Sequence, residues 1–500
     1  MQTDTITQLR ERLGELADLG AAIGLLHWDQ ETYMPPKAAE GRGLQLSTLS
    51  GLSHRMFTDP LMGNLLRSAL DDREQLDPDD RALVDVAWYD YERALKLPET
   101  FVQAFALEQS RAYETWVKAR EQSDFALFQP HLKTLLELLR QKADLLGYEG
   151  SPYNALLEDF ERGMTAEHVR GVFSELAKKQ SELVERIMAS PNQPDSAWLD
   201  AEWDEEAQWA FALRVLNDLG YDMAAGRQDR SVHPFSTGFD LYDVRITTRL
   251  SPKELFMGLM GSIHECGHAL YSQGHDPADR RTPLLDGASL GMHESQSRMW
   301  ENLIGRSLPF WRHYYPVLQQ HFPAQLDRIS PETFYHALNR VAPSLIRVEA
   351  DECTYNLHII IRFEIEVALL EGDLSVSDVP ALWNEKVRDY LGIEVPNDAQ
   401  GCLQDIHWAH GAMGYFPTYA LGNLYAAQLM ETIEKDLPDL WQQVETGQFA
   451  PLLDWLREHI HRIGRRKRPI ELMEDVTGRT PESGPYLRYL ERKYNTLYGL

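Results

Sequence analysis

Two histidines four residues apart, with a glutamate next to the first, form the stretch of this sequence with the clearest chemical meaning. His264 and His268 lie on one face if the segment is an α-helix, so both imidazoles can reach one metal ion. Glu265 then projects beside them, where it can take a proton from a water molecule activated by the metal. The spacing predicts half of a catalytic zinc site with its general base, and such a site needs a third ligand.

The residues before this motif predict the helix independently. Ser251 is placed as the N-cap, Pro252 as the first helical residue and Glu254 as the third, which together form a capping box. Apolar residues then recur at helical spacing, at Leu255, Phe256, Leu259, Met260 and Ile263. We therefore expect a helix that begins within residues 251–254 and buries one face.

The third ligand is expected on a neighbouring helix downstream. Catalytic zinc sites hold the metal with three protein ligands and leave a fourth position open. Residues 287–302 have a helical pattern and contain His293 and Glu294 side by side. Two histidines and one glutamate have precedent as ligands in catalytic zinc peptidases, so we favour Glu294 and keep His293 as the rival ligand.

Each ligand histidine is expected to have a hydrogen-bond partner on its other nitrogen. Such a partner fixes the orientation of the imidazole and is usually a carboxylate or carbonyl. In some zinc peptidases an acid lies four residues after the ligand glutamate, but here that position is Arg298. The remaining candidates, among which the sequence does not choose, are Glu301, Asp243 and Asp351.

Composition and charge limit the possible partners. Hydrophobic residues make up 43% and charged residues 25% of the chain, as in an ordinary globular protein. The formal net charge of −28 argues against nucleic acids and anionic membrane surfaces. The three cysteines are scattered and odd in number, which indicates a reducing compartment. Neither a secretory leader nor an apolar stretch long enough to span a membrane is evident, so we expect a cytoplasmic protein.

The pattern of apolar residues is helical along almost the whole chain. Clear amphipathic stretches include residues 132–146, 165–189, 200–219 and 425–433. A further helix is expected over residues 344–370, after an interruption by a proline.

One segment, just before the predicted metal helix, breaks this pattern. Residues 231–250 alternate partly between apolar and polar side chains and contain Gly238, which predicts a small β-hairpin or ribbon. No internal repeat or linker divides the chain. The predicted fold is therefore mainly α: residues 1–500 form a single large helical body with a small β-ribbon beside the zinc helix. A helical subregion of about residues 1–219 is expected to form one wall of it.

Several motifs resemble those of one peptidase family. The stretches His264-Glu265-Cys266-Gly267-His268 and His293-Glu294-Ser295-Gln296 are similar to the thermostable metallocarboxypeptidase family, often called carboxypeptidase Taq. Further stretches that match this family, in its order, are His233-Pro234-Phe235, Asp243-Val244-Arg245-Ile246-Thr247, Ile346-Arg347-Val348-Glu349-Ala350-Asp351 and Gly401-Cys402-Leu403-Gln404-Asp405-Ile406-His407-Trp408. Near the start, His27-Trp28-Asp29-Gln30 is similar to the family's N-terminal region. The resemblance spans almost the whole chain.

This resemblance implies a zinc- or cobalt-dependent metallocarboxypeptidase that removes C-terminal amino acids with broad specificity. It also implies a homodimer and a deep groove lined by helices. Carried over position by position, the family's metal ligands fall on His264, His268 and Glu294, and its general base falls on Glu265. Zn²⁺ is the expected cofactor, with Co²⁺ able to replace it, and peptides with a free C-terminus are the expected partners.

Two arginines are candidates for binding the carboxylate of such a substrate. A buried arginine can hold a carboxylate with two parallel hydrogen bonds. Arg347 and Arg245 are the candidates, and the family pattern favours Arg347. A purely structural role stays open for each, because Arg347 can pair with Asp351 four residues on in a helix, and Arg245 can pair with Asp243.

Other residues are candidates for contacts with the substrate backbone. His407, Tyr415 and Tyr419 can each donate a hydrogen bond to the oxyanion that develops during amide hydrolysis. Each can equally be an ordinary packed residue of the core. His233 is expected on the wall of the substrate site, again with a structural role as the alternative.

Two other functions stay open at this point. The same metal ligands would serve a zinc oligopeptidase or a dipeptidyl carboxypeptidase. A non-catalytic peptide-binding protein with a structural zinc is the second alternative. Structural zinc sites are usually closed by four Cys or His ligands, however, and Glu265 would then have no purpose.

Overall fold

The computed structural model describes residues 2–500, which are mostly helical with one small sheet. The helices before the sheet are α1 (Gln2–Thr32), α2 (Ala39–Phe57), α3 (Pro60–Asp71), α4 (Pro78–Lys96), α5 (Glu99–Gln122), α6 (Phe125–Leu146), α7 (Tyr153–Leu157), α8 (Ala166–Ala189) and α9 (Glu205–Asp218). The strands are β1 (Gly226–Arg230), β2 (Ser236–Asp240) and β3 (Asp243–Thr248). The helices after the sheet are α10 (Leu255–Gln273), α11 (Leu290–Arg298), α12 (Leu308–His321), α13 (Pro323–Leu326), α14 (Pro331–Leu338), α15 (Tyr355–Glu371), α16 (Val379–Leu391), α17 (Pro417–Asp436), α18 (Leu440–Glu445), α19 (Ala450–His459), α20 (Pro469–Thr477) and α21 (Gly484–Tyr498). The prediction of a mainly α fold with a small β element beside the metal helix is confirmed.

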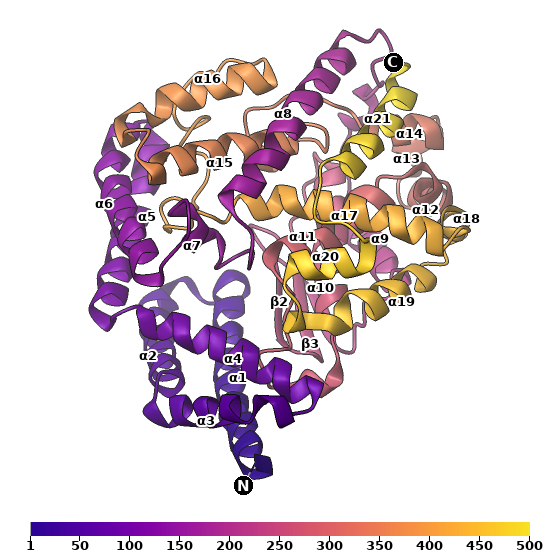
Figure 1. Cartoon of the computed structure of the whole chain (residues 1–500). Helices are drawn as coiled ribbons and strands as arrows, with labels where there is room; N and C mark the ends of the chain where they lie inside the picture. Colours follow the sequence, from indigo (N-terminus) through magenta and orange to yellow (C-terminus); the bar gives the residue numbers. More distant parts are fainter. Residues whose placement is uncertain (1) are drawn as a thin grey trace.

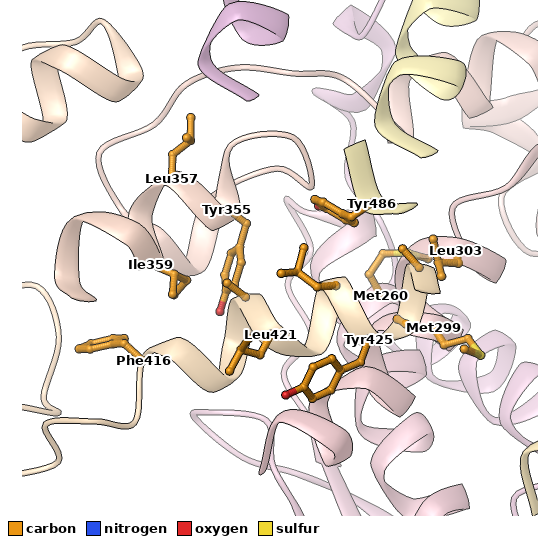
Figure 2. Packing of buried hydrophobic residues seen from close by; sticks show 14 of the residues in the cluster. Met260, Met299, Leu303, Tyr355, Leu357, Ile359, Phe416, Leu421, Tyr425 and Tyr486 are labelled. Carbon is orange, nitrogen blue, oxygen red and sulfur yellow. The ribbon is translucent and has the colours of Figure 1, made fainter. Parts of the chain in front are cut away.

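The helices gather around two main apolar cores of unequal size, and a third, very small cluster joins α6 to α7. The larger core draws on helices from α5 to α21, and α17 runs through its middle (Figure 1). Figure 2 shows Tyr355 and Ile359 of α15 beside Leu421 of α17 within it. Helices α1, α3 and α4, at the bottom of Figure 1, form a second and smaller core, which Leu284 joins from the loop between α10 and α11. Among residues 2–500, no helix has both the length and the apolar character that a membrane crossing requires.

The sheet follows the predicted hairpin and extends it by one strand. Strands β2 and β3 pair antiparallel, which confirms the hairpin expected over residues 231–250. β1 pairs with β3 in parallel and begins before that segment. The strand order β1-β3-β2 leaves β2 at an edge. Val244 and Ile246 of β3 are buried in the larger core, so the sheet is fixed against α10.

The predicted capping box before the metal helix is wrong. Helix α10 begins at Leu255, and Glu254 makes no side-chain capping hydrogen bond. The backbone carbonyls before it are used elsewhere: that of Ser251 accepts from Gln208 Nε2 at 2.8 Å, and that of Pro252 accepts from Trp203 N at 2.9 Å. These contacts with the α9 region hold the segment in a turn, so the helix begins where its apolar face begins.

The helix expected over residues 344–370 also begins later than predicted. Residues Arg347–Glu349 form a single 3-10 turn, and α15 begins only at Tyr355. The Asp351 carboxylate accepts a hydrogen bond from Cys353 N at 2.8 Å, so it holds the turn that precedes the helix. The alternative of a helical pairing between Arg347 and Asp351 is therefore wrong.

Helix α11 lies between α10 and α17, and a glycine marks each contact. A Cβ atom on Gly267 of α10 would lie 2.6 Å from Ser297 Cα, and a Cβ on Gly422 of α17 would lie 2.6 Å from Glu294 Cβ. Both distances are shorter than any ordinary contact between carbon atoms. Only glycine lets these helices approach so closely, and α11 is thereby fixed on two sides.

Replacing Gly267 by alanine should destabilise the protein by about 1–3 kcal/mol, because the added methyl group meets backbone atoms that cannot move aside. Gly171→Ala in α8 is the matched control, since a Cβ at that position meets nothing within 4 Å. There the same change should stabilise the helix by about 0.5–1 kcal/mol. Thermal and denaturant unfolding of both variants measures this, and equal effects at the two positions would contradict it.

Candidate active site

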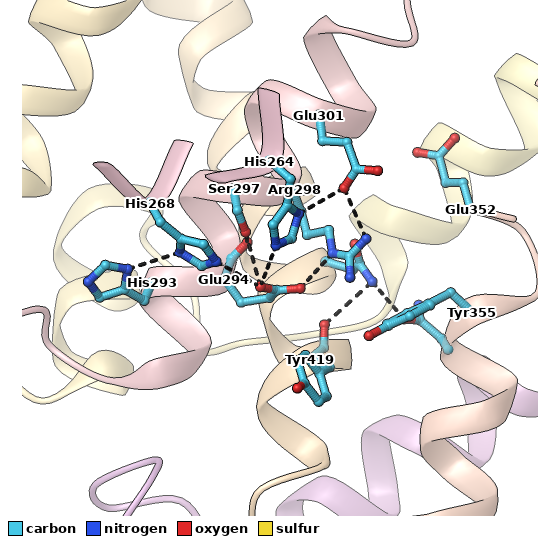
Figure 3. Close-up of polar contacts among 12 residues, drawn as sticks. His264, His268, His293, Glu294, Ser297, Arg298, Glu301, Glu352, Tyr355 and Tyr419 are labelled. Atoms are coloured by element: carbon cyan, nitrogen blue, oxygen red, sulfur yellow. Dashed lines mark hydrogen bonds and ion pairs between the residues drawn. The ribbon is translucent and has the colours of Figure 1, made fainter. Parts of the chain in front are cut away.

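Side chains from α10 and α11 meet at one point. The Nε2 atoms of His264 and His268, both on α10, lie 3.6 and 3.4 Å from Oε2 of Glu294 on α11 (Figure 3). One ligand atom from each of the three residues lies within 4.8 Å of the others. The structure thus brings together the three residues that the sequence pattern proposed as ligands.

The other nitrogen of each imidazole has a partner of its own. His264 Nδ1 lies 2.9 Å from Oε2 of Glu301, and His268 Nδ1 lies 3.0 Å from Nδ1 of His293. Burial lowers the pKa of His293 well below its ordinary value, so this imidazole is neutral and can accept the N–H of His268. Glu301 is therefore the acceptor among the three candidates, and His293 lies behind His268 (Figure 3).

Glu301 reaches the cluster from a widened helical turn. After Arg298, helix α11 continues as a π-helix, η5 (Met299–Ile304). Such turns are rare in proteins, and those that occur often lie at functional sites. Glu301 contacts both His264 and Arg298, whose Nη1 lies 3.1 Å from Glu301 Oε2. Burial opposes ionisation, but the charges of Arg298 and His264 prevail and lower the pKa of Glu301 to about 2.

Arg298 also fixes Glu294, the proposed carboxylate ligand. Arg298 Nε donates to Glu294 Oε1 at 2.6 Å, and the Ser297 hydroxyl donates to Oε2 at 3.0 Å. Burial would raise the pKa of Glu294, but Arg298 and the two imidazoles hold it well below its ordinary value. A buried, ionised carboxylate that faces two imidazole nitrogens is a donor set that fits a divalent metal ion.

Glu265 lies next to these residues on α10. Its side chain is buried, and its Oε2 accepts no hydrogen bond from any residue that the structure describes. Burial raises its pKa, while the charges of His264 and His268 oppose the shift. Glu265 therefore combines closeness to the ligands with a carboxylate oxygen that is available to a reactant.

A cavity of about 960 Å³ opens over the cluster. One wall comes from α1, at Ala17 and Asp18, and a second comes from the edge strand β2. The floor carries His264, Glu265, His268 and Glu294, and α17 adds Tyr419. Its volume is large enough to hold part of a peptide chain, and the cluster lies on its surface.

Arg347 lies behind this cavity and is held by other side chains. Its Nε and Nη2 donate to Asp405 Oδ1 at 3.1 and 2.9 Å, and its Nη1 donates to the Tyr355 hydroxyl at 2.9 Å. Its guanidinium carbon lies 5.0 Å from the ring centre of Tyr419, which lines the cavity. Arg362 donates to the other oxygen of Asp405 at 2.6 Å. Two buried guanidinium groups thus share one carboxylate.

Arg245 and His233 do not line the cavity. Arg245 Nε and Nη2 donate to the two oxygens of Asp243 at 2.7 and 2.9 Å, and its guanidinium carbon lies 4.4 Å from the ring centre of Trp28. These contacts join the sheet to α1. The His233 side chain is exposed, whereas the next residue, Pro234, lines the cavity.

Three residues proposed to stabilise the oxyanion lie together. Tyr415 and Tyr419 line the cavity, and His407 Nε2 lies 3.4 Å from the Tyr419 hydroxyl. Burial raises the pKa of Tyr419 well above its ordinary value and lowers that of His407 to about 3. The phenol therefore keeps its proton at neutral pH and can donate a hydrogen bond, with a neutral imidazole beside it.

The sequence matches the Carboxypeptidase Taq (M32) metallopeptidase family over residues 8–494. The chain belongs to this family. Carboxypeptidase 1 of Bacillus subtilis is 42% identical over 486 residues, which cover 97% of each chain. Thermostable carboxypeptidase 1 of Thermus thermophilus is 44% identical over 505 residues, covering 99% of this chain and 98% of that one. The crystal structure of M32 carboxypeptidase from Deinococcus radiodurans R1 has a TM-score of 0.98 at 42% identity and covers 99% of this chain and 100% of that one.

These comparisons confirm the resemblance seen in the motifs. The protein is an M32 metallocarboxypeptidase, which implies a metal ion and peptide substrates. The alternative of a non-catalytic peptide-binding protein is therefore set aside.

Two contacts of this metallocarboxypeptidase escaped the sequence analysis. The first is the pairing of Arg298 with Glu294, for which the spacing of four residues on one helix was an available signal. The second is Glu161, a buried residue after α7 that lies far away in the sequence. Its Oε2 accepts from Gly291 N at 2.9 Å and its Oε1 accepts from the Tyr425 hydroxyl at 2.7 Å. No local pattern signals this contact, which ties the first turn of α11 to α17.

Glu161→Gln should remove part of the pH dependence of stability. Burial raises the pKa of Glu161 to about 7, although donors from Tyr425, Ser289 and Gly291 oppose this. Because the folded pKa lies above the unfolded one, the stabilising contribution is complete below about pH 4.5 and is lost as the pH rises through about 7. Between pH 5 and 8 the wild type should lose up to about 3 kcal/mol relative to the variant, measured by denaturant unfolding. Parallel pH profiles for the two proteins would refute this.

Proposed function

We propose that this enzyme is a zinc carboxypeptidase that removes single residues from the C-terminus of peptides with broad specificity. The observation that carries the proposal is the meeting of His264, His268 and Glu294 on the wall of the cavity, with Glu265 beside them. In this scheme the three residues are the metal ligands, and Glu265 is the general base.

The residues around the proposed metal site have different roles in peptide hydrolysis. A bound metal ion supplies Lewis acidity, which polarises the scissile carbonyl and acidifies a water molecule. Glu265 takes the proton from the attacking water and delivers it to the leaving amine, for which its free Oε2 is suited. Glu301 and His293 keep the Nε2 atoms of the ligand histidines turned toward Glu294.

Arg347 is proposed to bind the terminal carboxylate of the substrate. Arg347 and Arg362 share only one carboxylate, that of Asp405, so their buried cluster carries an excess positive charge. A substrate carboxylate that arrives beside Tyr419 would neutralise this charge. We assign Arg245 to holding α1 against the sheet, because it pairs with Asp243 of β3 while its guanidinium lies against the ring of Trp28 of α1.

Tyr415 and Tyr419 are proposed to donate hydrogen bonds to the developing oxyanion. Both line the cavity, and burial raises the pKa of each, so the phenols stay protonated. His407 is proposed to orient Tyr419 through the contact between its Nε2 and the phenol.

Three further features remain proposals. Two imidazoles and a carboxylate favour Zn²⁺, with Co²⁺ able to replace it. A homodimer is proposed from the family resemblance alone. Free buried cysteines favour a cytoplasmic location. Metal analysis, light scattering and cell fractionation, respectively, would test these points.

Glu265→Gln should keep the metal and lose peptide hydrolysis by about three to four orders of magnitude, because the general base is removed and the ligands are not. Glu254→Gln, the same change just outside α10, is the control and should leave turnover near that of the wild type. Metal content by elemental analysis and a peptide time course by mass spectrometry measure both effects. Near-normal turnover of Glu265→Gln would exclude the mechanism.

A peptide with a free C-terminus should be cut about 100-fold faster than the same peptide with an amidated C-terminus, because only the free carboxylate can pair with Arg347. Arg347→Lys should reduce this ratio, since lysine keeps the charge and loses the two parallel hydrogen bonds. Mass spectrometry of the products should show a ladder of single residues. Equal cleavage of both peptides would remove the role of Arg347, and dipeptides or internal fragments would point to an oligopeptidase.

A further inference from the structure

One carboxylate on the cavity wall has neither an ion-pair partner nor a part in the proposed mechanism. The carboxylates on the described wall belong to Asp18, Asp240, Asp243, Glu265, Asp286 and Glu294. The ion pairs among them are Asp18 with Arg281, Asp240 with Arg280, Asp243 with Arg245 and Glu294 with Arg298. Glu265 is the proposed base. Asp286 alone of this set is left without a partner or a role.

The Asp286 carboxylate is free to bind a ligand. Its side chain is exposed within the cavity, and from the described residues its Oδ1 accepts only the N–H of Gly287, at 2.8 Å. The guanidinium of Arg465 lies near it but donates to both oxygens of Asp90, at 2.9 and 2.8 Å. Although Asp286 is open to the cavity, protein atoms surround it, and this desolvation raises its pKa.

Asp286 stands where a second groove meets the main cavity. This groove has a volume of about 530 Å³ and shares Ala17, Thr282, Leu285 and Asp286 with the main cavity. Its other walls combine the apolar side chains of Leu13, Leu16, Ile23, Phe57 and Pro283 with Ser50, Ser53, His54 and Arg465, whose guanidinium is held by Asp90. Such a surface suits the aliphatic stem of a long cationic side chain, whose charged end would reach the carboxylate at the junction.

The position of Asp286 relative to the metal ligands indicates which part of a peptide it meets. A Cβ on the adjacent Gly287 would lie 2.8 Å from His293 Cδ2, so Asp286 lies on the His293 side of the ligands. Figure 3 shows His293 at the left end of the cluster and Tyr355 toward the right, with Tyr419 below Glu294 between them; Tyr355 and Tyr419 are both neighbours of Arg347. With the terminal carboxylate at Arg347 and the scissile bond at the ligands, the upstream residues of the peptide run toward Asp286.

We propose that Asp286 binds a cationic group of the peptide on the amino-terminal side of the scissile bond and so sets a preference among substrates. The group is an ammonium or guanidinium, either from a lysine or arginine side chain or from the free amino terminus of a short peptide. The inference rests on the proposed function, because the direction of the peptide follows from the assignment of Arg347.

The test compares kcat/KM for matched peptides that differ only in this charge. One arm uses N-acetylated peptides with lysine or norleucine at the first or second position before the scissile bond. The other arm uses short peptides with a free or an acetylated amino terminus. The wild type should prefer the cationic member, and Asp286→Asn, which keeps an acceptor for Gly287 N, should lower this preference about five- to tenfold. Asp286→Lys should reverse it, and added salt should weaken it in the wild type.

Asp18→Asn is the matched control, since it changes the charge of the same cavity wall by the same amount at a carboxylate that is already paired. It should leave the preference unchanged. An unchanged preference in Asp286→Asn, or an equal loss in Asp18→Asn, overturns the inference. The arm that responds identifies the source of the cation. If amidated peptides are still cut slowly and the preference for a cationic group does not change in Asp286→Asn, only this inference fails. If amidated and free peptides are cut equally, the assignment of Arg347 fails, and this inference fails with it.

Discussion

The close approach of three helix backbones is the constraint on which the site depends. Helix α11 carries Glu294, and it lies against α10 at Gly267 and against α17 at Gly422, where no side chain fits between the backbones. This contact brings the carboxylate of one helix within 3.4–3.6 Å of the two imidazoles of another. Because α17 also carries Tyr419, the same packing sets the distance between the proposed ligands and a phenol that lines the cavity.

Charge explains why so polar a cluster is stable inside the protein. Glu294 and Glu301 are both buried and ionised, and Arg298 bridges them. Buried charges are tolerated when they are paired and hydrogen-bonded, and Arg306 Nη2, 3.4 Å from Glu301 Oε1, adds a second guanidinium to these two carboxylates. A metal ion between the imidazoles and Glu294 would place positive charge next to Glu265, a buried carboxylate that pairs with no cation among the described residues. Arg347 and Arg362 share one carboxylate, so this cluster carries excess positive charge, which a substrate carboxylate would neutralise.

The sequence predicted local features well and long-range ones poorly. The spacing of His264 and His268 on a helix needs no tertiary information, and the hairpin of β2 and β3 has its own alternating pattern. The starts of α10 and α15 were misplaced because carbonyls of residues 251 and 252 bond to the α9 region and Asp351 holds a turn. Asp286 could not be found at all, since its significance comes from two cavities that meet only in the folded protein.

The number of residues in the π-helix after α11 determines whether Glu301 can reach His264. An α-helix advances by about 100° per residue, so removing one residue from Met299–Ile304 would turn every later side chain by that angle relative to Glu294. Glu301 would then leave His264, although no residue in contact with the metal position had changed identity. A family member with one residue fewer in this π-helix would need another hydrogen-bond acceptor for the His264 imidazole, from a different element of the fold.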